Sequence, residues 1–319
     1  MNNNPIVSII IPTYNRRLTL IEAVDSCLLQ EGVTVEIIVV DDGSTDGTME
    51  ALQARDPRVR IFQQEHRGAC AARNLGLSEA RGRFIKFLDS DDRLAAGILA
   101  TQINALKESG AHIIYGDFEI CGNPKDPRIG GLPLRMTGSV EDPVNALLEG
   151  WWCANFSYLY RRESINDIRW SEELECLQDF DFSLKAAIKG NRFLYCSGVT
   201  GYYRMHEKQI TSGSAYRYAV NRCRIMERAL EYLRGTGSLT EERKYLIAHG
   251  YWTAARVFFR ADYPRFVNAV ARIKDLAPKF RPRFWAPWPV RALTRLVGIE
   301  KAERLLALRR TLLSSHESL

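Results

Sequence analysis

The first 116 residues alternate between short apolar runs and segments with helical spacing. Runs rich in β-branched residues predict five buried strands, at 7–12, 35–40, 59–62, 84–88 and 112–115. Apolar side chains at helical spacing predict three helices between them, at 17–30, 69–81 and 94–109. Continuous apolar strands separated by helices are typical of a largely parallel sheet whose two faces are covered. We therefore predict an α/β fold for this part of the chain.

The pattern changes after residue 116. Residues 117–215 combine a Gly- and Pro-rich segment at 122–138 with a helical pattern at 179–189 and a short apolar run at 193–196. Residues 216–319 show helical spacing, which breaks near 235–237 and again in the proline-rich run 278–289. The sequence therefore predicts an irregular second part and a helical C-terminal region.

Polar side chains follow three of the predicted strands. Pro-Thr-Tyr at 12–14 follows the first strand, Asp-Asp at 41–42 the second, and Asp-Ser-Asp-Asp at 89–92 the fourth. In open α/β sheets, ligands bind outside the carboxyl ends of the strands. These three segments therefore predict one binding site at a single edge of the sheet.

Four motifs occur in a fixed order here: VSIIIPTYNR, VVDDGSTDGT, GACAARNLGL and FLDSDD. Together they resemble the inverting family 2 glycosyltransferases of the GT-A fold, closely over residues 6–92 and loosely to about residue 211. The resemblance implies transfer of a sugar from a nucleotide-diphosphate donor to an acceptor hydroxyl, with inversion at the anomeric carbon. A UDP-sugar is the first choice of donor, with guanosine and thymidine diphosphate sugars as alternatives. The acceptor is a glycan, a lipid-linked sugar or a protein.

The same resemblance divides the chain into three parts. Residues 1–116 would form the nucleotide-sugar-binding half of a GT-A domain. Residues 117–215 would form its other half, which binds the acceptor and carries the catalytic base. Residues 216–319 would form a helical extension.

Asp89-Ser90-Asp91 matches the DxD motif of that family. A hard divalent cation, Mn²⁺ or Mg²⁺, bridges carboxylate and phosphate oxygens and stabilises the departing diphosphate. The resemblance implies that Asp91 ligates this metal and that Asp89 contacts the ribose. It also implies that His206, in the stretch YRMH, reaches the metal or the diphosphate. The alternatives are a solvated acidic loop for the two aspartates and a structural role for the histidine.

Five further residues are assigned to the donor by the same resemblance. Asp42 would accept a hydrogen bond from the nucleobase, and Tyr14 would stack on it. Pro12 and Thr13 would shape the pocket through their backbone groups, and Arg73 would approach the base or the diphosphate. Turn chemistry is the alternative for Asp42, and an ordinary surface arginine is the alternative for Arg73.

The segment LQDFD at 177–181 is the candidate for the catalytic base. The family usually has Glu-Asp here, whereas this chain has Gln178 followed by Asp179. By resemblance, Asp179 takes the proton from the acceptor hydroxyl, and a single carboxylate suffices for inversion. Asp181 is the competitor for this role, and a helix cap is the alternative role for Asp179.

Charge and composition add most in the C-terminal region. The net charge is +6, and residues 281–310 account for all of it with eight basic and two acidic residues. Leucines at helical spacing with arginines around the turn make this helix a candidate for contact with an anionic membrane surface. A helix packed on the body of the protein and a dimer contact are the alternatives. The segment is too short and leucine-rich to favour nucleic-acid binding.

Several classes of protein are excluded or disfavoured. Seven cysteines without a CxxC pair predict free thiols in a reducing compartment. The sequence has no signal-peptide pattern and no apolar run of about eighteen residues, so we expect a cytoplasmic protein, with peripheral association at the inner face of the cell membrane. A dehydrogenase and a P-loop NTPase lack their glycine motifs here. The remaining alternatives are an inactive nucleotide-binding homologue and, less favoured, a sugar nucleotidyltransferase.

Overall fold

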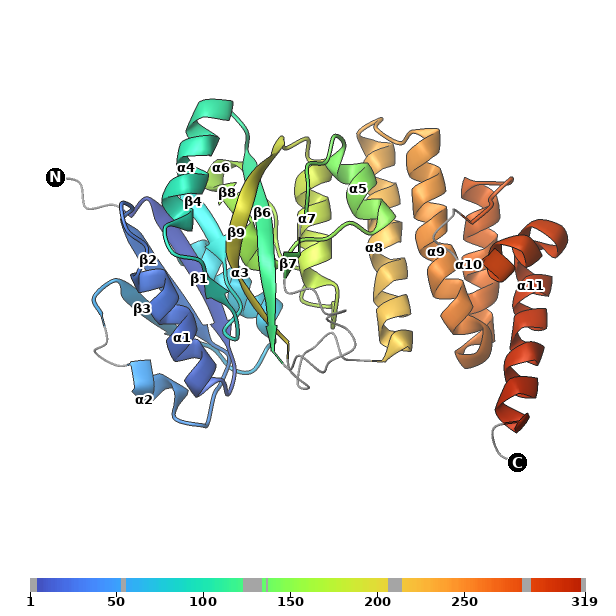
Figure 1. Cartoon of the computed structure of the whole chain (residues 1–319), viewed down its shortest axis with the longest axis horizontal. Coiled ribbons are helices and arrows are strands. Elements are labelled where there is room, and N and C mark those ends of the chain that lie inside the picture. Colours follow the sequence, from blue (N-terminus) through green and yellow to red (C-terminus); the bar gives the residue numbers. More distant parts are fainter. Residues whose placement is uncertain are drawn as a thin grey trace. The chain divides into compact units, whose positions relative to one another are not determined.

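The computed structural model describes residues 5–52, 56–122, 134–135, 137–205, 214–282 and 288–316 (Figure 1). Its contacts divide the chain into two compact units, residues 1–212 and 213–319. The first unit is built on one mixed sheet, with strand order β3-β2-β1-β4-β8-β6-β9-β5 and β7 paired to β6. The predicted α/β class is therefore confirmed.

The N-terminal half of the sheet is entirely parallel. Its strands are β1 (Val7–Thr13), β2 (Val35–Asp41), β3 (Val59–Gln63) and β4 (Phe84–Phe87). β1 lies between β2 and β4, and β3 pairs with the outer side of β2. Every residue of β1, β2 and β4 is buried, which explains their unbroken apolar character. The first four predicted strands are thus confirmed.

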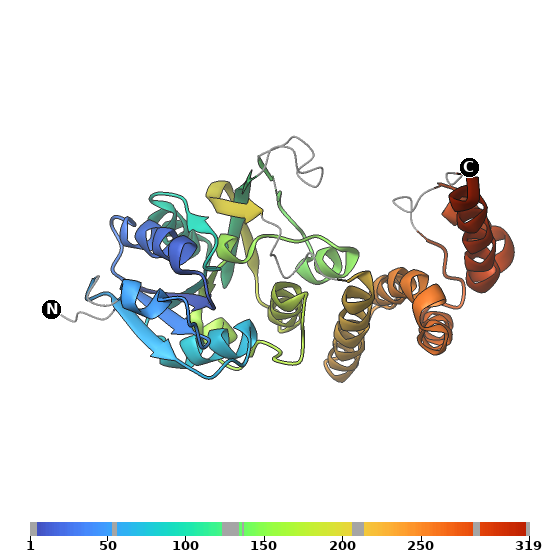
Figure 2. The same cartoon turned by 90° about the horizontal axis from the view of Figure 1, so that it is seen from below.

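Helices cover both faces of the sheet (Figure 2). Three of them connect the parallel strands: α1 (Arg17–Leu28), α2 (Thr48–Leu52) and α3 (Ala69–Glu79). A fourth, α4 (Ile98–Ser109), follows later in the chain. Right-handed crossovers place α1 and α3 on opposite faces, because the chain moves outward from β1 to β2 and back across from β3 to β4. The order therefore reverses between β1 and β4, and a crevice opens at their carboxyl ends.

The second half of the sheet is mixed. Its strands are β5 (Arg93–Leu94), β6 (Ile113–Gly122), β7 (Leu134–Arg135), β8 (Leu159–Arg161) and β9 (Phe193–Met205). β6 and β9 pair in parallel through two register shifts, which makes both strands much longer than their apolar runs predicted. The helix predicted from residue 94 is shorter, because Leu94 pairs with Gly201 in the sheet and α4 begins at Ile98.

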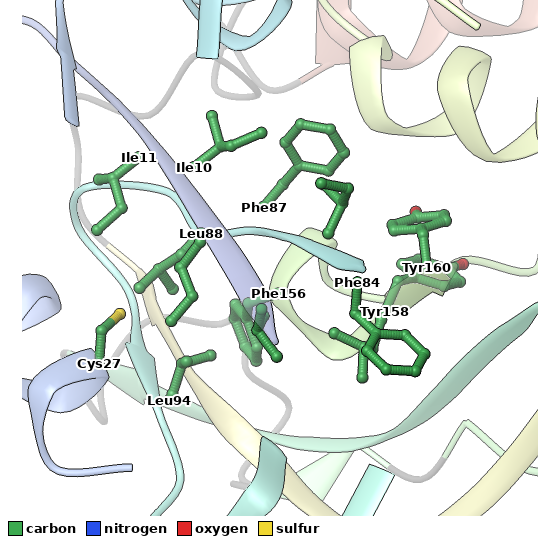
Figure 3. Packing of buried hydrophobic residues seen from close by; sticks show 14 of the residues in the cluster. Ile10, Ile11, Cys27, Phe84, Phe87, Leu88, Leu94, Phe156, Tyr158 and Tyr160 are labelled. Carbon is green, nitrogen blue, oxygen red and sulfur yellow. The ribbon is translucent and has the colours of Figure 1, made fainter. Parts of the chain in front are cut away.

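Short helices complete this unit. They are α5 (Pro143–Glu149), the 3₁₀ turn η2 (Asn155–Ser157), α6 (Arg162–Ile165) and α7 (Gln178–Ile188). α7 corresponds to the helix predicted at 179–189, and residues 179–181 lie in the first turn of α7. α7 is anchored by Phe182, whose ring stacks on Trp170 at 4.4 Å and meets Phe87 of β4 edge to face at 5.3 Å. Figure 3 shows Phe87 beside Ile10 in the buried core of the sheet. This aromatic cluster fixes the start of α7 relative to the ends of the strands.

The second unit is helical, as predicted. It contains α8 (Ala215–Gly235), α9 (Glu241–Ala261), α10 (Tyr263–Leu276) and α11 (Trp288–His316). α9 packs against both α8 and α10, and α11 bends at Gly298, where φ is 79°. Within the described ranges, no helix has the length and apolar character needed to cross a membrane. All seven cysteines are free, as the sequence predicted.

Candidate functional site

The crevice between the ends of β1 and β4 holds a pocket of about 280 Å³. Every residue that the sequence assigned to the donor lines it, as does the assigned metal ligand: Pro12, Thr13, Tyr14, Asp42, Arg73, Asp89 and Asp91. Five further residues line the pocket. Among them, Arg16 and Asp92 come from loops and Tyr203 comes from β9, and the sequence assigned no role to these three. His206 falls outside the described residues, although Tyr203 of the same YRMH stretch reaches the pocket.

The acidic turn after β4 brings three carboxylates into four residues. Asp92 is buried and accepts a hydrogen bond from the backbone N–H of Arg204 at 2.8 Å. Burial raises the pKa of Asp92 well above its usual range, and the neighbouring charges of Asp91 and Asp89 add to the rise. Asp91 lies 3.9 Å from the guanidinium of Arg16. A divalent cation at this turn would relieve the repulsion among the carboxylates.

These residues fit a cation that is shared with a ligand. Across the described residues, no group of three or more His, Cys, Asp or Glu side chains could hold a metal by itself. Asp89 and Asp91 nevertheless both line the pocket. Mg²⁺ and similar ions are commonly bound by one or two carboxylates together with waters and substrate phosphates. The site therefore suits a metal that binds together with a diphosphate.

Arg73 connects the acidic turn to α7. Its guanidinium donates to Asp89 at 2.7 Å and to Oε1 of Gln178 at 3.0 Å, and it lies over the ring of Trp170 at 4.5 Å. Burial lowers the pKa of Arg73, but the charge and hydrogen bond of Asp89 together with the other nearby groups outweigh burial, and the net pKa is raised. Arg73 is only 7% exposed, so the surface-arginine alternative is wrong. Because Gln178 is neutral, Arg73 has one carboxylate partner here, Asp89, whereas a glutamate at position 178 would give it two.

Asp179 lies in the first turn of α7, one residue after Gln178. Burial raises its pKa above the usual range, the charge of Asp89 adds to the rise, and Arg73 opposes it. Asp179 is therefore close enough to the acidic turn to feel its field, although it does not line the donor pocket itself. A carboxylate with a raised pKa is the better proton acceptor, because basicity increases with pKa.

Asp181 is engaged elsewhere. Its buried carboxylate accepts a hydrogen bond from the Ser171 hydroxyl at 2.7 Å and forms an ion pair with Lys185 at 2.6 Å. Lys185 also donates to Ser171, which closes a three-membered network on the side of α7. These partners give Asp181 a structural role and favour Asp179 as the base.

Backbone strain flanks the site. Among the described residues, only Asn15 and Leu177 adopt a positive φ without being glycine, at 50° and 61°. Asn15 follows Tyr14, and its side chain accepts a hydrogen bond from the N–H of Thr45 at 2.8 Å. Leu177 immediately precedes α7 and therefore sets the direction of Asp179. Such conformations cost about 1–3 kcal/mol and cluster at functional sites.

Asp42 is held by four donors from the loop between β3 and α3. Its carboxylate accepts from Nε2 of Gln64 at 2.7 Å and from the backbone N–H groups of Arg67 and Gly68 at 2.8 and 2.9 Å. The fourth group is Nδ1 of His66, which lies 2.9 Å from the carboxylate and forms its hydrogen bond with the main-chain carbonyl of Asp42, at 3.1 Å. Gly68 has a φ of 91°, a conformation that glycine adopts without strain. The local turn bond is made instead by the neighbouring Asp41, whose carboxylate accepts from the N–H of Ser44 at 3.2 Å, whereas the donors to Asp42 come from a distant loop.

His66 also contacts Tyr14. The two rings stack with centroids 4.1 Å apart and planes inclined by 27°. The sequence analysis missed His66, because it lies in a polar loop 24 residues after Asp42 and outside the recognised motifs. Only the return of that loop to the end of β2, where the N–H of Gln64 donates to the carbonyl of Asp41, brings the groups together.

Comparisons with known proteins bear on the family of this chain. The family model described as glycosyl transferase family 2 matches residues 8–169. An uncharacterized glycosyltransferase of Haemophilus influenzae is 32% identical over 211 residues, which cover 62% of this chain and 82% of the relative. WfgD of Escherichia coli, a UDP-Glc:α-D-GlcNAc-diphosphoundecaprenol β-1,3-glucosyltransferase, is 40% identical over 120 residues, which cover 37% of this chain and 47% of the relative. The matches to several other curated relatives also span less than half of their length.

Solved structures show the same fold. TarS 1-349 of S. aureus, in complex with UDP-GlcNAc, matches with a TM-score of 0.70 at 19% sequence identity. The match covers 96% of this chain and 91% of TarS 1-349. At this level of identity the likeness establishes the architecture, including a helical region after the sheet domain.

Proposed function

The chain belongs to glycosyl transferase family 2, and we propose that it is an inverting, metal-dependent hexosyltransferase that uses a UDP-sugar donor. One observation carries the proposal. A single pocket at the strand-order reversal is lined by all six residues assigned to the donor and by Asp91, and Arg73 links that pocket through Gln178 to the start of α7. The groups that can bind a nucleoside diphosphate thus lie next to the candidate catalytic base, Asp179.

The residues divide the work by their chemistry. Tyr14 and Asp42 would contact the base, and the cationic Arg73 and Arg16 would face the diphosphate. Asp89 would contact the ribose, and Asp91 would hold Mn²⁺ or Mg²⁺, which acts as a Lewis acid on the phosphate oxygens when it is bound. Pro12 and Thr13 would form the wall of the pocket beside the base.

Transfer then follows in a single displacement. The acceptor oxygen forms a bond to the anomeric carbon as the bond from that carbon to the diphosphate oxygen breaks. The acceptor proton goes to Asp179, and the diphosphate leaves with the bonding electron pair as UDP. Attack opposite the leaving group inverts the anomeric configuration, so an α-linked donor gives a β-linked product. Only one carboxylate base is needed.

The proposed acceptor is a sugar carried on a polyprenyl diphosphate, as in surface polysaccharide synthesis. The name of WfgD, a relative that matches 120 residues of this chain, supports this choice. Such an acceptor lies in a membrane, and the second unit offers a surface for it. In α11, Trp288 and Leu296 are 72% and 80% exposed, and Arg295 is exposed beside Leu296. Exposed Trp and Leu mixed with Arg suit an anionic interface, here the cytoplasmic face of the cell membrane.

Calorimetry with free nucleotides tests the donor site. UDP, GDP and dTDP would each be titrated with Mn²⁺ and with EDTA. We expect UDP to bind only when Mn²⁺ is present, and Asp91→Ala to abolish that binding. Asp56→Ala is the matched control, because it removes one carboxylate that lies at the surface and pairs with Arg58. It should bind UDP as the unchanged protein does.

Other outcomes would correct the proposal at defined points. Metal-dependent binding of GDP or dTDP in place of UDP would change the donor class. Failure of all three nucleotides to bind would indicate an inactive homologue. A product assay on vesicles that contain a polyprenyl-linked acceptor would then test the stereochemistry, and an α-linked product would exclude inversion. Equal binding to neutral and anionic vesicles would exclude the electrostatic role of α11.

A further inference from the structure

Four donors surround the carboxylate of Asp42. A carboxylate offers about four acceptor positions. Gln64 and the N–H groups of Arg67 and Gly68 donate three hydrogen bonds to it at 2.7–2.9 Å. Nδ1 of His66 lies 2.9 Å from the same carboxylate and forms its hydrogen bond with the main-chain carbonyl of Asp42, at 3.1 Å. The Asp42 side chain is buried, at 4% exposed, so a nucleobase N–H can reach it only if one of these four groups moves away.

Two of the four donors cannot leave without moving the chain. The N–H groups of Arg67 and Gly68 belong to the backbone that leads directly into α3. The other two are side chains, Gln64 and His66, which can rotate on the nanosecond scale. The ring of His66 is 58% exposed, so solvent can receive it. The choice is therefore between these two side chains.

His66 makes both contacts that a pyrimidine base would make at this position. It is a flat ring stacked on Tyr14 at 4.1 Å, and its Nδ1 faces the Asp42 carboxylate at 2.9 Å. The carboxylate and the main-chain carbonyl of Asp42 both only accept, so the Nδ1 that faces them carries a proton, as the imide N–H of uracil does. Gln64 makes the hydrogen bond but has no ring to place on Tyr14.

We propose that His66 is an internal stand-in for the donor nucleobase, which vacates Tyr14 and Asp42 when the nucleotide binds. The proposal rests on the proposed function, in which Tyr14 and Asp42 contact the base. The exchange replaces one stack and one hydrogen bond by another pair of the same kind. The base therefore adds little net affinity, and the diphosphate with its metal supplies most of it. His66 would keep the aromatic face and the buried carboxylate satisfied between turnovers.

His66→Ala removes the competitor and leaves Tyr14 and Asp42 open. We expect the affinity for UDP, measured by calorimetry with Mg²⁺, to rise about tenfold, the factor that corresponds to about 1.4 kcal/mol. Inorganic pyrophosphate has no base, so its affinity should be the same in both proteins. Gln64→Ala is the matched control. It removes the other side-chain donor to Asp42 but leaves His66 on Tyr14, so UDP affinity should not rise.

A spectroscopic readout on the unchanged protein gives an independent test. The ring C–H signals of His66, assigned by their loss in His66→Asn, should shift towards those of a solvated histidine when UDP and Mg²⁺ are added. Pyrophosphate with Mg²⁺ should leave them in place. A ring that stays stacked on Tyr14 in the UDP complex would overturn the exchange even if the variants fold poorly.

The outcomes distinguish this proposal from the proposed function on which it rests. If the unchanged protein binds no UDP with metal, the proposed function fails. If it binds UDP and His66→Ala binds UDP more weakly or equally, His66 supports Tyr14 from behind and the stand-in is wrong. If Gln64→Ala alone gains affinity, Gln64 is the donor that leaves and the stand-in is again wrong.

Discussion

Two aspartates in the first turn of α7 offer a direct test of the catalytic assignment. Asp179 and Asp181 are two residues apart, and either one matches a carboxylate base by sequence alone. Asp179→Asn and Asp181→Asn make the same chemical change in each. We expect the first to abolish turnover at little cost in stability, and the second to lower stability while leaving most of the turnover.

The magnitudes follow from the contacts. A positioned general base contributes about 10²- to 10⁴-fold, which corresponds to about 2.7–5.5 kcal/mol in the activation free energy. The pKa of Asp179 is raised in the folded state. At a pH above that pKa the ionised carboxylate therefore destabilises the folded protein, and a neutral amide removes this cost. Asp179→Asn should therefore be neutral or stabilising at pH 7.

The expectation for Asp181 is the reverse. Its carboxylate is buried between Lys185 and Ser171, and an amide loses the charge that pairs with the ammonium. Breaking a fully buried pair costs about 3–5 kcal/mol, but Lys185 is 33% exposed and can be solvated again. We therefore expect a loss of about 1–3 kcal/mol in the free energy of unfolding.

The assay pairs UDP-sugar turnover with urea unfolding for the two variants. UDP binding with Mn²⁺ would be measured as well, because Asp179→Asn should retain it. Two results would refute the reasoning. One is turnover by Asp179→Asn within tenfold of the unchanged protein, and the other is loss of turnover in Asp181→Asn at temperatures where it stays folded.

Three further predictions concern pH and packing. Because burial raises the pKa of Asp179, the acid limb of the pH profile of kcat should lie above the range of an ordinary carboxylate, and rates should rise as pH increases through it; a flat profile down to pH 4 would contradict this. Burial lowers the pKa of Lys86 to about 7, so the unfolded chain binds an extra proton between about pH 7 and pH 10. Stability should increase with pH across that window by up to about 1.4 kcal/mol per unit, and urea titrations should show that Lys86→Met removes this dependence. In Gly76→Ala the new methyl would lie 2.4 Å from Ile10 of β1, so thermal unfolding should show a loss of about 1–3 kcal/mol, whereas Gly235→Ala, with open space around it, should be neutral or stabilising.

The parallel half of the fold could be predicted because three of its four strands, β1, β2 and β4, are buried on both faces. Under that condition an apolar run marks the whole strand, as it does from Val7 to Thr13. β9 does not meet the condition. Its residues are mostly half-exposed, and Ser197 and Gly198 interrupt the apolar pattern. The strand continues because Asp117 of β6, at a register shift, accepts hydrogen bonds from the hydroxyl of Tyr195 and the N–H of Gly198. Such a contact between distant segments produces no periodic pattern of apolar residues in the local sequence.

The pocket was predictable for a different reason. Parallel strands end on one edge, so polar residues that follow β1, β2 and β4 must meet there whatever the loops do. The partners of Asp179 and Asp181 were not predictable, because both aspartates lie in one helical turn and differ only in the elements they face. Lys185 is visible as an i,i+4 partner of Asp181, but the hydroxyl of Ser171 comes from a loop whose course the sequence does not show.

Asp42 shows why a motif residue can have two roles at once. Its position after β2 is enough to place it at the base pocket, and that much follows from the sequence. Its four donors come from residues 64–68, a loop that returns from β3 to the end of β2 before α3 begins. Because the carboxylate has no spare capacity, the strength of base binding depends on how readily that loop releases one donor. Selectivity among nucleotide donors should therefore vary more with the side chain at position 66 than with the carboxylate at position 42, and exchanging that side chain is the change most able to alter it.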